Sequence, residues 1–135
     1  MVVLKFNPQA SLIRLRVVLV SEFKKAAVMV FDPGASITLV TPQIAEALGS
    51  EFIPSASPMS IFTAGGTARA HRLQLKSLSL YGETLAPVDA LCSPLPTGLG
   101  ADGLLGLNVL RHLKIGLDFE TGTLTFDRIQ SVSPS

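Results

Sequence analysis

The sequence has little of what several classes of protein require. Its 135 residues include a single cysteine, Cys92, so the chain cannot form an internal disulfide bond and must fold without one. Charged residues make up 16% of the chain, the net charge is +1 and the basic residues are scattered, which gives no electrostatic reason to expect a nucleic-acid partner. No apolar stretch approaches the length of a membrane span, and no positively charged N-terminal segment precedes an apolar one. These absences predict a soluble, cytoplasmic protein without a membrane partner, and they leave open whether it is cut from a longer precursor.

What is present is typical of one compact domain. A chain of this length can bury a single modest core, and 47% of its residues are apolar. We expect residues 1–135 to form a single domain, with the core at about 12–127 and a frayed tail at 128–135. So large an apolar share in a small chain also suggests that a partner covers part of the surface.

Short apolar runs separated by turn residues predict a mostly β domain. Residues 11–20 alternate between apolar side chains and two arginines, as expected of a half-buried strand. Thr41 and Pro42 begin a short helix that ends at Gly49, and a second helix is expected at 107–113. Further strands are expected at 26–31, 37–40, 59–64, 67–80, 85–91, 115–119 and 123–127. The pattern favours a closed β-barrel with one or two short helices.

The longest predicted hairpin lies in the middle of the chain. Gly65 and Gly66 separate its two arms and suit a two-residue turn. In the second arm, Leu73 and Leu75 stand at odd positions and Leu78 and Leu80 at even positions, so the two pairs would face opposite sides of an unbroken strand. This change of parity predicts a bulge near 76–77.

One carboxylate stands in a tight turn directly after an apolar run. The segment Asp32-Pro33-Gly34-Ala35-Ser36 follows residues 26–31, and the proline and glycine suit the second and third positions of a type II turn. A plain surface turn, in which Asp32 bonds its own backbone, is the alternative interpretation of this segment.

Together with Leu104-Leu105-Gly106, this segment resembles the motifs of the single-domain, retropepsin-like aspartic proteases of clan AA. In that family an apolar strand precedes Asp-Thr/Ser-Gly-Ala, and an apolar-apolar-Gly segment precedes a later helix. The likeness covers roughly residues 12–126. It implies the acid protease fold, hydrolysis of peptide bonds and a hairpin that acts as a flap.

The chemistry that this resemblance implies needs two aspartates, and the sequence supplies one Asp-x-Gly-Ala. A two-fold symmetric homodimer would bring Asp32 against its own copy, so that the two catalytic carboxylates share a proton. The resemblance implies substrate-binding roles for Gly34, Ala35 and Ser36 in the loop, and for Ala64, Gly65 and Gly66 in the flap. The expected partners are a second copy of the chain and a peptide or protein substrate.

Pro33 departs from the family pattern, which has Thr or Ser at this position. There the hydroxyl and the backbone N–H cross-link the two active-site loops, and proline has neither donor. Two interpretations follow: a less pre-organised protease, or a catalytically silent dimer that binds peptides or serves assembly.

Other motifs are weaker evidence of function. Gly98, Gly100 and Gly103 fit the dinucleotide-binding G-x-G-x-x-G pattern, but two prolines and no strand directly precede them. His71, His112 and Cys92 are too few and too scattered for a zinc site, so no metal or cofactor is expected. Ser36 has no nearby base and is not expected to be a nucleophile.

Overall fold

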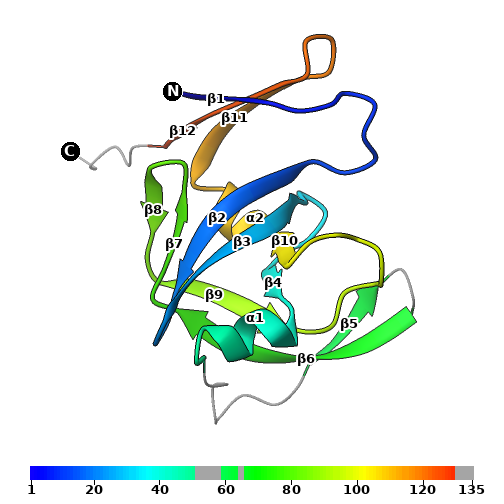
Figure 1. The fold of residues 1–135 in the computed structure, drawn as a ribbon, viewed down its shortest axis with the longest axis vertical. Helices are drawn as coiled ribbons and strands as arrows, with labels where there is room; N and C mark the ends of the chain where they lie inside the picture. Colours follow the sequence, from blue (N-terminus) through cyan, green and yellow to red (C-terminus); the bar gives the residue numbers. More distant parts are fainter. Residues whose placement is uncertain (51–58, 64–65, 130–135) are drawn as a thin grey trace, which may run out of the picture.

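The computed structural model describes residues 1–50, 59–63 and 66–129, which are mostly strand with two short helices (Figure 1). The helices are α1 (Pro42–Ala47) and α2 (Leu107–Leu110). The strands are β1 (Val2–Lys5), β2 (Arg14–Val20), β3 (Lys24–Phe31), β4 (Thr38–Val40), β5 (Met59–Thr63), β6 (Gly66–Leu75), β7 (Ser77–Leu80), β8 (Glu83–Leu85), β9 (Val88–Cys92), β10 (Gly103–Leu105), β11 (Leu113–Asp118) and β12 (Thr123–Arg128).

The larger sheet, with nine strands, closes into a barrel because one long bent strand takes part at two places. In the order β5-β6-β9-β4-β10-β3-β2-β7-β8, β6 pairs with β9 and β7 pairs with β2. Only Lys76 separates β6 from β7, and its N–H donates to the carbonyl of Val20 at 2.9 Å. The bent strand thus links the two sides of the sheet (Figure 1). The predicted closed barrel with two short helices is confirmed.

Alternation of apolar and polar residues determines which side of each strand faces the core. In β2, Leu15, Val17 and Leu19 are buried, whereas Arg14 and Arg16 are exposed. After the bend the parity changes as predicted, because the leucines at 73, 75, 78 and 80 are all buried. The bend therefore keeps both halves of the long strand facing one core.

A second sheet, in the order β1-β12-β11, covers one end of the barrel. Leu124 and Phe126 of β12 belong to the same buried cluster as Leu15 of β2. Figure 1 shows this sheet beside β2, at the end of the molecule where the N-terminus lies. The sequence did not predict β1, which pairs with β12 from Val2 opposite Phe126 to Lys5 opposite Thr123.

Strand β10 runs between β3 and β4, parallel to the first and antiparallel to the second. The fit is tight at Gly103, where an added Cβ would lie 2.2 Å from the carbonyl oxygen of Leu39. Only glycine allows so close an approach of the backbones. This crossing brings the end of β3 beside the end of β10, where the predicted active-site segments lie.

Several expected boundaries were wrong. The second helix ends at Leu110, because Leu113 already belongs to β11 and pairs with Arg128. The strand expected at 85–91 is divided into β8 and β9 by Ala86 and Pro87, and proline cannot donate to a strand ladder. The strand expected at 11–20 begins at Arg14, and that expected at 26–31 already begins at Lys24.

The middle hairpin also differs from the prediction in its turn. Gly66 pairs with Thr63, so Gly66 belongs to the second arm and not to the turn. Residues 64 and 65 lie outside the described part of the chain.

Candidate active site

Asp32 follows β3 directly and is held by its own loop and by β10. Its N–H donates to the carbonyl of Leu105 at 3.2 Å, and its carbonyl accepts from the N–H of Ala35 at 3.1 Å. One carboxylate oxygen, Oδ1, accepts from the N–H of Gly34 at 3.0 Å. The half-buried carboxylate therefore has a fixed direction and retains oxygen lone pairs for another partner.

The predicted type II turn at this loop was wrong. Gly34 does not have the positive φ that a type II turn requires at its third position, whereas five other glycines of the described residues do. The bond from Ala35 to Asp32 and the exposed Pro33 at the second position are compatible with a type I turn. A side chain at position 34 would crowd the carboxylate, because its Cβ would lie 3.2 Å from Oδ1 of Asp32.

The rest of the loop is bound to the segment that follows β10. The carbonyl of Ala35 accepts from the N–H of Leu107 at 2.8 Å. Ala35 is half-buried, and Ser36 is exposed. The two sequence motifs, 32–36 and 104–106, are thus brought into contact by the fold.

A buried polar bridge, which the sequence did not indicate, lies at the end of this loop. Thr38 is fully buried, and both its N–H and its hydroxyl donate to Oδ1 of Asn108, at 2.8 Å and 2.9 Å. The hydroxyl also accepts from the N–H of Gly106 at 3.1 Å. Nδ2 of Asn108 donates to the carbonyl of Asp89 at 2.7 Å. In the sequence, the only signal for this bridge was one polar residue, Thr38 or Asn108, in each of two apolar segments.

Asp102, the acid nearest the second motif, has a different role. Its Oδ2 accepts from the N–H of Val28 at 2.9 Å, and its own N–H donates to the carbonyl of Val28 at 2.7 Å. Leu105 lies opposite Phe31 in the β3–β10 pairing, so Asp102 lies several residues along β3 from Asp32. Asp102 therefore stabilises the β3–β10 pairing, and Asp32 is the one carboxylate that the described residues of this loop present.

The β5–β6 hairpin extends beyond the barrel, on the same side as the loop after β3 in the view of Figure 1. Of the predicted hairpin residues, Ala64 and Gly65 lie outside the described residues and Gly66 begins β6. Their role in substrate binding stays a prediction.

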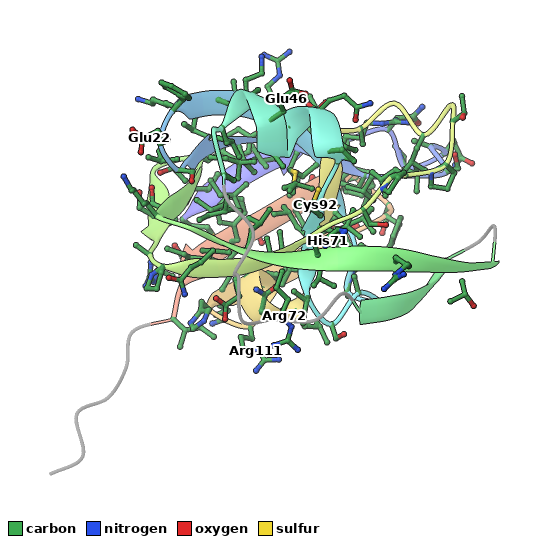
Figure 2. All side chains as sticks on the ribbon, turned by 90° about the horizontal axis from the view of Figure 1, so that it is seen from below. Glu22, Glu46, His71, Arg72, Cys92 and Arg111 are labelled. Atoms are coloured by element: carbon green, nitrogen blue, oxygen red, sulfur yellow. The ribbon has the colours of Figure 1, made fainter. Side chains whose placement is uncertain are left out.

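The remaining candidate residues do not form a site. His71 and Cys92 lie opposite each other in β6 and β9 (Figure 2), Cys92 is buried, and His112 is exposed in the turn after α2. Burial raises the pKa of the Cys92 thiol. Within residues 1–50, 59–63 and 66–129, no three His, Cys, Asp or Glu side chains lie close enough to hold a metal ion. No helix in this part of the chain has the length and apolar character needed to cross a membrane.

The glycine pattern at 98–103 does not form a nucleotide-binding turn. Such a motif connects a strand to a helix, but Gly103 begins strand β10 and the helix that follows β10 has four residues. This segment therefore lacks the strand–turn–helix arrangement that dinucleotide binding requires.

Comparison with known proteins agrees with this fold. The family model described as aspartyl protease matches residues 18–109. The structure is similar to that of a retropepsin-like aspartic protease from Rickettsia conorii, with 21% identity, a TM-score of 0.67 and coverage of 91% of this chain and 95% of that one. It is also similar to the EIAV protease in complex with the inhibitor HBY-793, with 14% identity, a TM-score of 0.59 and coverage of 80% and 92%. No curated protein sequence matches the chain.

Proposed function

Because this chain belongs to the aspartyl protease family, we propose that it is an aspartic endopeptidase that is active as a homodimer. The observation that carries the proposal is the position of Asp32. Asp32 is half-buried and directly follows strand β3, and its own N–H and the carbonyl of Ala35 are bound to the segment 105–107. A rigid loop of this kind is what a catalytic carboxylate requires.

A homodimer supplies the second carboxylate. Hydrolysis by aspartates needs one ionised carboxylate to activate water and one protonated carboxyl to donate a hydrogen bond to the scissile carbonyl. Asp102 is engaged with Val28, so Asp32 is the one carboxylate that the described residues of this loop offer in each protomer. A two-fold axis close to Asp32 would place it against its copy, and like-charge repulsion would keep one proton on the pair.

The substrate in this proposal is an extended peptide. Gly34 and Ala35 are small and would let the peptide backbone approach the carboxylates, with Ser36 at the exposed end of the loop. The hairpin, including Ala64, Gly65 and Gly66, would close over the peptide and exclude water. Main-chain hydrogen bonds along an extended peptide would then fix the scissile bond above the carboxylate pair.

A second function is favoured by one observation, Pro33. This residue is exposed at the tip of the loop and provides neither the hydroxyl nor the N–H with which the family cross-links its two loops. A dimer with this loop could bind a peptide in the same groove without cleaving it. We favour the protease because Asp32, Gly34 and Ala35 are all present and the loop that carries them is bound to the segment 105–107.

The deciding experiment compares the wild-type protein with Asp32→Asn on a mixed peptide library from acidic to neutral pH. Asp102→Asn is the matched control, because its amide oxygen can still accept from the N–H of Val28. Cleavage by the wild type and by the control, but not by Asp32→Asn, is expected. If all three proteins bind peptides and none cleaves them, the chain is instead a catalytically silent dimer that binds peptides.

Sedimentation velocity, with and without peptide, tests the dimer independently. We expect the wild type to sediment as a dimer at the concentrations at which it cleaves. A monomer at high concentration, with no peptide-induced association, would contradict the shared pair of carboxylates.

A further inference from the structure

We infer that Asn108 and Thr38 act together as positioning residues for Asp32, and that they hold its loop from within one protomer. The inference rests on the proposed function, because it assigns to the bridge a role in the same hydrolysis. Neither side chain is expected to contact the substrate.

Both ends of the Asn108 amide are bound, which fixes its orientation. Oδ1 accepts from the N–H and the hydroxyl of Thr38 at 2.8 Å and 2.9 Å, and Nδ2 donates to the carbonyl of Asp89 at 2.7 Å. Since Asp89 belongs to β9, Asn108 connects α2 to two strands of the barrel. The amide is therefore a fixed support on the barrel wall.

Thr38 transfers this support to the loop. Its hydroxyl donates to Asn108 and accepts from the N–H of Gly106 at 3.1 Å, so both of its hydrogen-bonding functions are used in a fully buried position. A buried network in which each group has a partner is rigid. Thr38 thus anchors the end of the loop that begins at Asp32.

The start and the middle of the loop are bound to the same short segment. Asp32 donates to the carbonyl of Leu105, and the carbonyl of Ala35 accepts from Leu107. Residues 105–108 therefore hold the loop at its beginning, middle and end. If the bridge at Thr38 is removed, the other two contacts have to position the carboxylate alone.

Pro33 makes this support more important in the present chain. A proline at this position cannot form the bonds across the dimer axis that a Thr or Ser would form. The position of each carboxylate then depends on bonds within its own protomer. In the proposed dimer any displacement also occurs twice, because symmetry repeats it in the second loop.

The test is a pair of substitutions at one position. Thr38→Val keeps the shape of the side chain and removes the hydroxyl, whereas Thr38→Ser keeps the hydroxyl. Misplacement of a reacting group by about 1 Å costs about 100-fold in rate, so we expect kcat of Thr38→Val to fall by about 10–100-fold. KM should change by less than about threefold, because peptide-binding contacts of the hairpin are unaffected. Thr38→Ser should be within about threefold of the wild type in both constants.

Two further readouts separate positioning from general destabilisation. The width of the pH–rate profile should change in Thr38→Val, because the coupling of two carboxylates depends on their separation. Asn108→Ala should reproduce the kcat loss and serves as a second variant if Thr38→Val does not fold. Lys114→Gln, at an exposed position of β11 outside the segment 105–108, should leave kcat and the profile unchanged.

Amide hydrogen exchange tests the bridge without any need for activity. In Thr38→Val the amides of Asp32, Ala35 and Leu107 should exchange at least about tenfold faster, while amides in β12 keep their wild-type rates. Wild-type kcat in both bridge variants, or an even rise in exchange over the whole chain, would overturn the inference. If the wild type cleaves nothing, the proposed function fails, and the exchange rates alone decide whether the bridge holds the loop.

Discussion

Replacing Gly106 by alanine probes the closest approach between the two motifs of the candidate active site. An added Cβ at this position would lie 2.5 Å from the carbonyl carbon of Ile37, 2.7 Å from the nitrogen of Thr38 and 2.8 Å from the oxygen of Ile37. All three atoms belong to the backbone, so no side-chain rotation can relieve the overlap. The loop between β3 and β4 would have to move away from α2.

The expected loss of stability follows from these distances. Ordinary contact begins near 3.4 Å, so the backbones must separate by about 0.9 Å, the difference from 2.5 Å. A shift of this size disrupts the bonds from Gly106 to Thr38 and from Leu107 to Ala35, each worth about 0.5–1.5 kcal/mol net. Overpacking adds about 1–3 kcal/mol. Gly106→Ala should therefore lower the free energy of unfolding by about 2–6 kcal/mol.

Urea denaturation followed by circular dichroism measures this loss. Gly98→Ala is the matched control: Gly98 has a φ of 88°, but no atom lies within 4 Å of an added Cβ. The control should cost only about 1–2 kcal/mol, from backbone strain. If Gly106→Ala is no less stable than Gly98→Ala, the close approach of the two motifs is not as the structure has it.

Three further predictions concern other parts of the molecule. Pro33→Thr should tighten dimer association by about tenfold or more, since each bond regained between the two loops is worth about 1 kcal/mol; an unchanged dissociation constant in sedimentation equilibrium would contradict the role given to this residue. Cys92 should react slowly with a thiol reagent at neutral pH, because it is buried and its raised pKa keeps the thiol protonated, and rapidly in denaturant; fast labelling of the native protein would refute its burial. Leu78→Ala, at a fully buried position of β7, should cost about 2–5 kcal/mol in urea denaturation, whereas Phe23→Ala, 62% exposed, should cost much less; equal losses would argue against the core as described.

Much of the barrel could be predicted because its signals are local. The alternation in β2, the cap at Thr41 with Pro42 after it, and the parity change near Lys76 each depend on residues close together in the chain. The carboxylate of Asp32 could be located for the same reason, since a turn directly follows an apolar strand.

Contacts between distant residues were the part that the sequence did not predict. Strand β1 is fixed by its pairing with β12, more than 100 residues further along the chain. The bridge between Thr38 and Asn108 likewise forms only when β10 runs between β3 and β4. A buried threonine and a helical asparagine look ordinary until the fold brings them together.

The bent strand that closes the barrel also has a mechanical consequence. Strand β6 is an arm of the exposed hairpin, and across Lys76 it continues as β7, which is hydrogen-bonded to β2. Strand β2 is in turn paired along its length with β3, at whose end Asp32 stands. If the hairpin moves when the proposed protease binds a peptide, the movement is either taken up by the bend at Lys76 or transmitted through β7, β2 and β3 to Asp32. A substitution that makes the backbone at Lys76 more rigid or more flexible would therefore change how strongly the positions of the hairpin and of Asp32 are coupled.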